Sequence, residues 1–584
     1  VLPQEVDYVE AHGTGTRLGD PIEAAALGAV LGAQRPPEQP LRVGSVKTNI
    51  GHQEGAAGIA GLIKAALAIQ HREIPPSLHF AEANPLIPFS DLHLEVVTKL
   101  QSWPSPRPAL AGISSFGWGG TNCHVLLAGL DAATSQLALL GAEDEAGLRA
   151  AAATLAEQAL DPSRPLSDLC PPGTGSGRHR LAVLAKTRSG LGEQVHRWLH
   201  GQPVASCRSF VAPAGQRRLA LVFSPQGGQW RGMATQLLRA SSGFRQTLTA
   251  CDAAISRHGG WSLLKELHAP GPHAGTTAII QPSLFAVQAA LAAELGAQGV
   301  CPDVVVGHSL GEITAAYVSG ALSLDDAARV VVHYSRLQAR TAGDGGMALV
   351  QLPLPEASAL IEPFAGDVCV AGDNGPSTTL VSGRPAALDQ IVSQLSGRGI
   401  FAARIDVNIA AHGPQMDPIL DELRAALVDL QPRACRIPMW STSTCGLVAG
   451  HTLDGAWFAH NLRSPVRFAE AIRALSAGGT DLFVEVNPHP ILLPSIQEGL
   501  AAAGAGGFAC GTLLRGGDEQ QALLDTIGRL WVHGAALGPK GAGAALQPEP
   551  AAALPQLVVL SARSEAALTA QAARLREHLQ SHEE

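Results

Sequence analysis

The sequence has few aromatic residues, no paired cysteines and no uninterrupted apolar run that reaches the roughly 20 residues of a membrane span. Its nine cysteines are scattered singly, without a Cys-x-x-Cys pair or a histidine-cysteine cluster. We therefore expect reduced, mostly buried thiols, no disulfide framework and no metal site. The most promising apolar run, IAGLIKAALAI, contains Lys64, so no membrane association is expected.

Charge is also sparse. Charged residues make up 16% of the 584 residues, and the formal net charge is -9, which gives no reason to expect nucleic-acid binding. The apolar content of 46% is that of a globular chain, and the length predicts about three to four domains. The sequence starts at Val1 without a signal peptide. We expect a cytoplasmic piece of a longer polypeptide.

The stretch VVVGHSLGE, residues 304–312, combines a short apolar run with a Gly-x-Ser-x-Gly turn and an alanine-rich continuation. A buried strand, a sharp turn and a helix in this order predict a nucleophile elbow, in which Ser309 stands at a helix N-terminus. Gly307 and Gly311 fit this prediction because a side chain at either position would press on the neighbouring strand or helix. The alternative is an ordinary strand-turn-helix with a capping serine.

Two histidines stand in glycine- and threonine-rich loops. His12 lies in EAHGTGT, and His52 lies in KTNIGH, where Lys47 precedes it. By themselves these residues are also compatible with solvated turns. Together with SSFGWGGTNCHVLL, however, the two motifs resemble the C-terminal half of a β-ketoacyl synthase of the modular type I polyketide synthases.

In that family the two histidines, with the lysine, serve decarboxylation and condensation at a nucleophilic cysteine that precedes them. Only eleven residues precede His12, so the resemblance implies that this cysteine is missing, and Cys123 is not a substitute for it. Residues 1–128 are therefore expected to be a partial thiolase-like domain that is inactive alone. A parent homodimer formed through the ketosynthase is also expected.

The region that follows is expected to be an α/β linker. Residues 129–216 contain LALLGAEDEAGLRAAAATLAEQAL, which has helical periodicity, then a break rich in proline and glycine, and then RLAVLAKT, which predicts a strand. In the resemblance this is the linker between ketosynthase and acyltransferase.

The resemblance to an acyltransferase of the malonyl-CoA:ACP transacylase type covers residues 217–510. RRLALVFSPQGGQWRGM is similar to the family's glutamine-glycine turn, with Pro225 where the first glycine usually stands. By this resemblance the backbone amides of Gln226 and Leu310 form the oxyanion hole, although a plain turn is the alternative for this motif. His412 falls at the catalytic histidine and is expected to serve Ser309 as general base. Asn487 or a nearby carbonyl is expected to orient it.

An inserted subdomain is expected within the acyltransferase. Residues 348–408 alternate predicted strands and helices in the order βαββαβ, which is typical of a ferredoxin-like unit. AIIQPSLFAVQAALAAELGAQG, which precedes the elbow, is expected to be an amphipathic helix. The predicted fold class is α/β: a partial thiolase-like domain, an α/β linker and an α/β-hydrolase-like acyltransferase core with a ferredoxin-like insertion.

The function implied is transfer of an acyl group from acyl-CoA through an acyl-serine to the phosphopantetheine thiol of an acyl carrier protein. Acyl-CoA is then a substrate, and no tightly bound cofactor is expected. The expected partners are the carrier protein and the rest of the synthase polypeptide. A serine esterase or thioesterase is the second hypothesis, because it shares the elbow chemistry. A non-catalytic interaction module is the third, and the intact motifs argue against it.

A second set of residues is expected to select the acyl group. Family members that load malonyl-type extenders carry an arginine twenty-five positions after the serine, and this position is Tyr334 here, while Arg336 is expected to face away on the helix. Ile409, Ala410 and Ala411 precede His412 and match neither the HAFH nor the YASH tetrapeptide of the family. We therefore predict a non-carboxylated starter unit, with a malonyl or methylmalonyl extender as the alternative.

The end of the chain suggests a repeat. Residues 511–556 are expected to be a post-acyltransferase linker of low complexity in its second half. Residues 557–580 align without gaps on residues 137–160 with eleven identities in twenty-four positions. We read 557–584 as the start of a second linker, which predicts a second acyltransferase downstream. Chance similarity of alanine-rich helices, or the start of a region before a reductive domain, are the alternatives.

Overall fold

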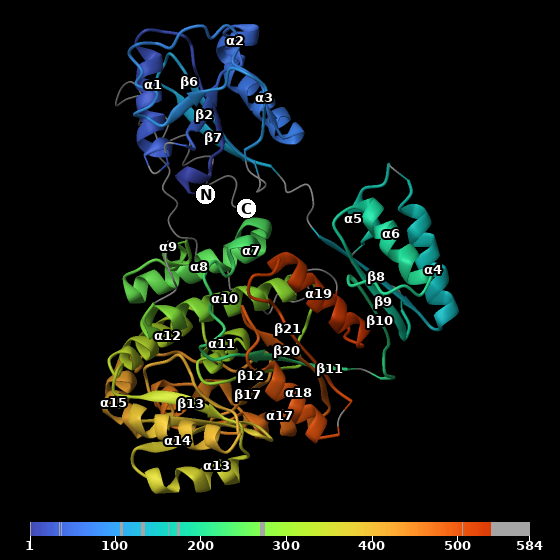
Figure 1. The fold of residues 1–584 in the computed structure, drawn as a ribbon, viewed down its shortest axis with the longest axis vertical. Helices are drawn as coiled ribbons and strands as arrows, with labels where there is room; N and C mark the ends of the chain where they lie inside the picture. Colours follow the sequence, from blue (N-terminus) through green and yellow to red (C-terminus); the bar gives the residue numbers. More distant parts are fainter. Residues whose placement is uncertain are drawn as a thin grey trace, which may run out of the picture. The chain divides into compact units, whose positions relative to one another are not determined.

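The computed structural model describes residues 2–538 except 34, 37, 105–108, 130–134, 162, 172–175, 216, 269–274 and 505. Contacts divide the chain into two compact units, with the boundary between Thr134 and Ser135, and each unit is described by itself (Figure 1). The predicted repeat at 557–580 and the end of the predicted post-acyltransferase linker lie outside the described residues.

The first unit is built on a five-stranded sheet. Its order is β4-β2-β1-β6-β7, with the first four strands parallel and the last antiparallel. The strands are β1 (Tyr8–Glu10), β2 (Leu41–Gly44), β4 (Leu94–Val96), β6 (Leu110–Phe116) and β7 (Asn122–Ala128). The helices are α1 (Gly19–Leu27), α2 (Lys47–Ile50) and α3 (Ala57–His71), and a small two-stranded ribbon joins β3 (Glu73–Ile74) to β5 (Gln101–Ser102).

The sequence of this unit explains its element ends. Each histidine-bearing loop leads into a helix: the His12 loop joins strand β1 to α1, and the His52 loop joins α2 to α3. Gly51 between α2 and His52 has a φ of 75°, which favours glycine. The alanine and glycine side of α3 is buried, whereas Ile59, Ile63 and Leu67 on its other side are exposed.

The second unit begins with a three-stranded antiparallel sheet of order β10-β9-β8, formed by β8 (Gln136–Ala142), β9 (His179–Ala185) and β10 (Cys207–Val211). Helices α4 (Glu145–Gln158) and α6 (Arg188–Leu199) pack together beside this sheet (Figure 1). The helical periodicity predicted from Leu137 onward is only partly correct, because LALLGA is strand β8. The helix starts after Asp144, whose carboxylate accepts the Gly147 N–H.

Helix α19 (Glu519–Val532) ties this linker sheet to the rest of the second unit. Trp531 and Val532 pack with Ala182 of β9, and an added Cβ on Gly528 would lie 3.1 Å from the Ala182 Cβ. The Arg180 guanidinium lies 4.0 Å from the centre of the Trp531 ring. The second unit therefore joins residues before and after the predicted acyltransferase core.

The core of the second unit is a six-stranded sheet of order β18-β17-β12-β11-β20-β21. Its strands are β11 (Arg218–Phe223), β12 (Val304–Gly307), β17 (Met439–Ser441), β18 (Gly446–Leu447), β20 (Thr480–Val486) and β21 (Phe508–Gly511), all parallel except β18. Side chains alternate along β11, so Leu219, Leu221 and Phe223 join one apolar cluster and Ala220 and Val222 the other. Both faces of the sheet are thus covered.

Helices provide the two covers. α8 (Ser242–Gly259), α10 (Thr277–Ala297), α11 (Gly311–Val318) and α12 (Leu324–Ala339) contribute to the larger cluster, and α17 (Phe468–Ala477) and α18 (Leu493–Ala502) to the smaller one. The prediction that α10 is amphipathic is wrong, because it is surrounded by other elements and buried on nearly all sides. It is long and apolar enough to cross a membrane, contrary to the expectation from the sequence, but 83% of its most apolar window is buried inside the protein.

The inserted subdomain has the predicted order βαββαβ. It consists of β13 (Gly346–Val350), α13 (Leu354–Ile361), β14 (Val368–Gly375), β15 (Thr378–Gly383), α14 (Pro385–Gly397) and β16 (Ala402–Arg404). The sheet order β16-β13-β15-β14 is antiparallel throughout, and the short β19 (Val466–Arg467) adds in parallel beside β14. The ferredoxin-like prediction is confirmed.

Candidate functional site

The predicted elbow is present between β12 and α11. Ser309 has a φ of 55°, a left-handed conformation that costs energy for a residue with a side chain. Glycine is needed on both sides of it, because an added Cβ on Gly307 would lie 2.2 Å from the Glu312 nitrogen and one on Gly311 would lie 2.0 Å from the Phe223 carbonyl oxygen. The crossing of β11 against the start of α11 therefore fixes where the serine hydroxyl stands.

His412 lies opposite this serine. Its Nε2 is 2.6 Å from the Ser309 Oγ, and its side chain is almost fully buried, with 2% exposed. The ring is oriented from behind by a backbone group, since Nδ1 is 2.9 Å from the Ser464 carbonyl oxygen. Because Nδ1 carries the hydrogen in this arrangement, Nε2 is the acceptor that faces the serine.

The sequence left open whether Asn487 or a carbonyl orients His412, and the structure has a carbonyl in that place. Asn487 is instead bound within the core: its Oδ1 is 3.3 Å from Gln288 Nε2, and its Nδ2 donates to the His489 carbonyl at 2.7 Å. Gly228 makes room for this amide, because an added Cβ there would lie 2.1 Å from Asn487 Nδ2. Asn487 thus supports the glycine-rich loop that follows β11.

Burial sets the charge of His412. Burial lowers its pKa to about 4, and hydrogen bonds with the backbone of Ser464 and Asn461 oppose this shift. The imidazole is therefore neutral around pH 7, which is the form that accepts a proton. His308, the residue before the serine, is also buried, and its pKa is lowered to about 4 by desolvation. Its Nε2 is 2.8 Å from Asn374 Oδ1 in the inserted subdomain.

The predicted oxyanion donors stand where the elbow and the loop after β11 end. Leu310 caps α11 and is buried, and Gln226 is half-buried in the loop. Within the described part of the chain, neither backbone N–H donates to another protein group. The Gln226 side chain is 3.5 Å from Gln281 Nε2 on α10, and Gln281 in turn pairs with Gln338 on α12 at 3.3 Å. Pro225 leaves the Gln226 N–H unaltered, because it removes only its own donor.

A buried carboxyl that sequence reasoning missed stands behind the elbow. Glu312 in the first turn of α11 accepts hydrogen bonds from Ser441, Thr442 and Ser443. Burial raises its pKa to about 7, although these hydrogen bonds oppose the shift. Thr442 also donates to the Gly307 carbonyl at 2.8 Å. Glu312 is the last residue of the GHSLGE motif, and an acidic residue within this apolar stretch could have indicated a buried carboxyl.

Tyr334 is fully buried on α12, and it is the acyl-specificity candidate that lies at the serine. Its hydroxyl donates to Asn461 Oδ1 at 3.0 Å. Burial raises the pKa of the phenol well above its ordinary value, and the nearby Ser309 hydroxyl opposes this rise. Arg336, two residues later, is exposed and close to His333, as expected for the other face of the helix.

The other three candidates lie in the segment before His412. Ile409 and Ala411 pack into an apolar cluster with Met347, Ala371 and Leu380 of the inserted subdomain. Ala410 packs against Gly345, where an added Cβ would lie 2.5 Å from the Ala410 Cβ. These side chains therefore fix the path of the chain into His412, and no polar group of theirs is aimed at the serine.

The two histidines of the first unit also come together. The rings of His12 and His52 are 5.5 Å apart in an edge-to-face arrangement. The His12 loop is held by Glu23, which accepts the N–H groups of His12 and Gly13. Desolvation, followed by the nearby Lys47 and His52, lowers the pKa of His12. The predicted set His12, Lys47 and His52 is therefore one local cluster, with His52 exposed.

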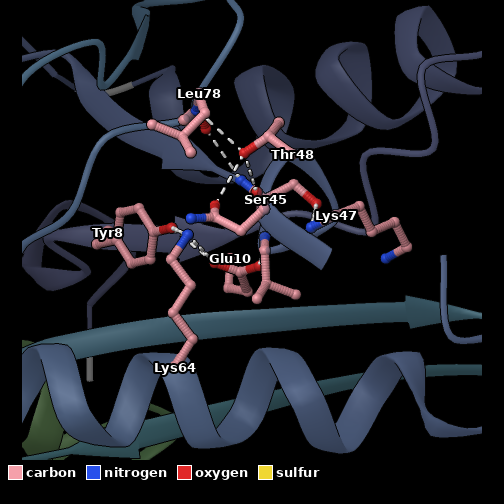
Figure 2. Close-up of polar contacts among 10 residues, drawn as sticks. Tyr8, Glu10, Ser45, Lys47, Thr48, Lys64 and Leu78 are labelled. Atoms are coloured by element: carbon pink, nitrogen blue, oxygen red, sulfur yellow. Dashed lines mark hydrogen bonds and ion pairs between the residues drawn. The ribbon is translucent and has the colours of Figure 1, made fainter. Parts of the chain in front are cut away.

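A buried ion pair supports this cluster from below. Glu10 on β1 lies 2.8 Å from Lys64 of α3 and accepts the Tyr8 hydroxyl at 2.7 Å, as shown in Figure 2. The other Glu10 oxygen accepts the Val46 N–H, next to Lys47. One carboxylate thus connects the strand that leads to His12 with the loop that leads to His52. Cys123 on β7 is exposed, and all nine cysteines are free.

Comparison with known proteins places this geometry in a family. Residues 220–536 match the acyl transferase domain, residues 1–81 the C-terminal domain of β-ketoacyl synthases, and residues 83–165 the ketoacyl-synthetase C-terminal extension. The chain belongs to the modular type I polyketide synthases. It contains the acyltransferase domain of such a synthase.

The polyketide synthase relatives are much longer than this chain. The spectinabilin polyketide synthase system protein NorA' of Streptomyces orinoci is 41% identical over 91% of this chain and 15% of its own length. Erythronolide synthase EryA3 of Saccharopolyspora erythraea is 41% identical over 88% of this chain and 17% of its own length. The chain thus spans less than a fifth of either synthase.

Solved acyltransferase domains share the fold. The acyltransferase domain from module 8 of the salinomycin polyketide synthase is 34% identical, with a TM-score of 0.66 over 70% of this chain and 98% of that one. A loading acyltransferase from the avermectin modular polyketide synthase is 38% identical, with a TM-score of 0.52 over 54% of this chain and 99% of that one. The predicted family and fold class are confirmed.

Proposed function

We propose that residues 217–510 transfer an acyl group from acyl-CoA to the phosphopantetheine thiol of an acyl carrier protein by way of an ester on Ser309. The observation that carries this proposal is the 2.6 Å contact between Ser309 Oγ and the neutral His412 Nε2. A serine hydroxyl is a weak nucleophile without an adjacent base. Here the base is adjacent, uncharged and oriented.

Transfer then takes place in two halves. Ser309 Oγ attacks the thioester carbonyl carbon while His412 Nε2 takes the hydroxyl proton, and the N–H groups of Gln226 and Leu310 bind the developing oxyanion. The carbon–sulfur bond breaks, and the CoA sulfur leaves with the proton from His412. In the second half the carrier thiol gives its proton to His412, attacks the acyl-serine and releases the serine hydroxyl.

The partner of His412 also bears on the esterase hypothesis. A serine hydrolase triad places an Asp or Glu against the histidine Nδ1, whereas the group here is the neutral Ser464 carbonyl. Two of the buried acids of the core have other partners: Glu312 accepts from residues 441–443, and Glu485 accepts from Ser224 at 2.6 Å. This arrangement favours an acyl transferase dyad over a triad hydrolase.

The acyl group that we propose is a non-carboxylated starter. Tyr334 is uncharged and its hydroxyl is already bound to Asn461. Among the described residues, no arginine or lysine donates a hydrogen bond to the side chain of Tyr334 or Asn461. Besides burial, the acidic Glu312 raises the pKa of Tyr334. A malonyl carboxylate buried beside Tyr334 would lack a cationic partner, and charge-assisted bonds are worth about 1.5–3 kcal/mol each. The resemblance to a loading acyltransferase agrees with this choice.

The test separates transfer from hydrolysis. The purified chain is incubated with propionyl-CoA and a phosphopantetheinylated carrier protein of the same synthase, and both proteins are measured by intact mass. We expect acyl-Ser309 first and acyl-carrier afterwards, with little free acid. Release of free acid at the same rate with and without carrier protein would instead support a thioesterase.

For the first unit we propose that His12 and His52, with Lys47, serve the condensation reaction of the parent synthase, and that the unit does not condense alone. The support is their joint placement, with rings 5.5 Å apart and loops connected through Glu10. A cytoplasmic parent that dimerises through its ketosynthase belongs to the same proposal.

A further inference from the structure

The C-terminal end of helix α16 (Gly455–Arg463) contacts both Tyr334, the acyl-specificity candidate, and His412, the proposed base. Asn461 Oδ1 accepts the Tyr334 hydroxyl at 3.0 Å. One residue later, the Leu462 carbonyl accepts the His412 backbone N–H at 3.1 Å. Ser464, just after the helix, holds the His412 ring through its carbonyl at 2.9 Å. Four consecutive positions therefore connect Tyr334 to His412.

His412 depends on these contacts for its position. Its φ is 61°, in the left-handed region that a histidine adopts only when its surroundings hold it there. Its own neighbours in the chain, Ala411 and Gly413, provide packing but no hydrogen bond to the imidazole ring. The ring is held by Ser309 on one side and by the end of α16 on the other. A shift of α16 would therefore move Nε2 relative to the serine.

The Tyr334–Asn461 bond is placed to resist such a shift. Both side chains are buried, with 0% and 1% exposed, so water cannot replace either partner without opening the core. Tyr334 stands on α12, whose apolar residues belong to the main cluster, as do Phe458 and Leu462 of α16. The bond thus fixes the rotation of the α16 end against α12.

We propose that Asn461 is a positioning residue, which couples Tyr334 through the Asn461–Ser464 segment to His412 and so holds the base at its 2.6 Å contact with Ser309. This inference rests on the proposed function. The further claim is that Tyr334, which selects the acyl group, and His412, which activates the serine, are both held by the segment 461–464. A change at Tyr334 is then expected to alter the rate as well as the selectivity.

The test uses Asn461→Leu, which removes the acceptor and nearly conserves volume, in single-turnover loading of Ser309 from propionyl-CoA. We expect the rate at saturating propionyl-CoA to fall about tenfold to a hundredfold, as for a misplaced catalytic group. The half-saturating concentration should change less than about threefold, because the substitution weakens catalysis of the acylation step and not the binding of propionyl-CoA in the ground state.

The second arm shows whether Asn461 acts through the base. In a His412→Ala background, Asn461→Leu should change the residual loading rate less than about twofold, because the group that it positions is gone. Tyr334→Phe, which removes a single oxygen, should also slow loading, and combining it with Asn461→Leu should add less than about twofold. Equal slowing in both His412 backgrounds would overturn the proposal, as would a pure increase in the half-saturating concentration.

A control variant, a fallback variant and a second substrate make the result interpretable. Arg467→Gln lies three residues beyond Ser464, removes an exposed pair with Glu470, and should leave loading within about twofold of the original rate. If Asn461→Leu does not fold, Tyr334→Phe carries the same two readouts with a smaller change. The same measurements with malonyl-CoA separate the two proposals: a faster malonyl reaction refutes the starter preference while the coupling is still measured, and no loading from either refutes the acyltransferase site.

Discussion

The two histidine sites of this chain differ in how deeply the histidine is buried and in how many groups of the chain bind its ring. His412 is 2% exposed, is bonded on both ring nitrogens and faces a serine that the fold presents to it. His52 is exposed, and its ring accepts only the N–H of the nearby Glu54 among the described residues. We infer that the acyltransferase site is complete within residues 217–510, whereas the ketosynthase cluster requires further groups.

The difference also concerns charge. At the acyltransferase site, burial keeps the base neutral, and among the residues that the structure describes no arginine or lysine is hydrogen-bonded to Tyr334. At the ketosynthase cluster, Lys47 and the Glu10–Lys64 pair place full charges within the supporting structure. Burial thus prepares one site for proton transfer, whereas at the other the Glu10–Lys64 ion pair and the hydrogen bond from the Val46 N–H to Glu10 connect the two loops.

The sharpest break in this comparison is expected from His412→Ala. Without the base, loading of Ser309 from acyl-CoA should slow by about 10² to 10⁴, the usual contribution of general-base catalysis. Ser309→Ala sets the baseline of no covalent adduct, and Ser377→Ala, in a turn of the inserted subdomain, should load normally. Loading is measured by intact mass over time. An adduct that persists in Ser309→Ala would show that another residue is acylated.

A change in the first unit should affect stability without affecting loading. Lys64→Met removes one partner of a buried ion pair and leaves Glu10 without its cation. The free energy of unfolding should therefore fall by about 3–5 kcal/mol. Hydrogen exchange of peptides from β1 and α3 should accelerate accordingly, while loading of Ser309 stays within experimental error. Slower loading in this variant would mean that the two sites are not independent.

The elbow glycines permit a smaller and more local test. Gly311→Ala places a Cβ 2.0 Å from the Phe223 carbonyl oxygen, so the strand or helix must move, at a cost of about 1–3 kcal/mol. Gly446→Ala is the matched control, because nothing lies within 4 Å of its added Cβ. The two variants are compared by urea unfolding and by hydrogen exchange of peptides from β11 and α11. Equal stability of both variants would contradict the close crossing at the elbow.

The smallest expected effect is that of pH on loading. Because burial lowers the pKa of His412 to about 4, the rate at pH 5.5 should stay within about twofold of that at pH 7.5, whereas a base with an ordinary pKa of about 6.5 would lose about tenfold. The unfolded state binds the proton more readily, so the His412 contribution to stability should fall as pH drops from about 6.5 to 4. Rate measurements at both pH values and thermal unfolding across this range check the two statements.

Patterns with a steric or periodic cause were predictable from the sequence. The elbow at Ser309 follows from two glycines around a serine after an apolar run, and the βαββαβ order of the inserted subdomain follows from alternating strands and helices. Both are confirmed. The strand at 136–142 was missed, because LALLGA continues without a break into an alanine-rich helix and the two patterns merge.

Contacts made by backbone or by uncharged side chains were not predictable. The Ser464 carbonyl that orients His412 has no side-chain signal, since every residue offers the same group. Asn461 is likewise distant from Tyr334 in the sequence, and an asparagine in NLRSPV is equally typical of a helix end. The burial of α10 on nearly all sides depends on neighbouring elements such as α8 and α12, which a single segment does not reveal.

The central claim is that a neutral site built on Tyr334 loads a non-carboxylated acyl group. It is tested most directly by a competition in which the chain meets equal concentrations of isobutyryl-CoA and malonyl-CoA, and the Ser309 adducts are resolved by intact mass. We expect the isobutyryl adduct to dominate, and we expect Tyr334→Arg to shift the ratio towards malonyl because it supplies a guanidinium for the carboxylate. A dominant malonyl adduct on the unaltered chain would contradict the account.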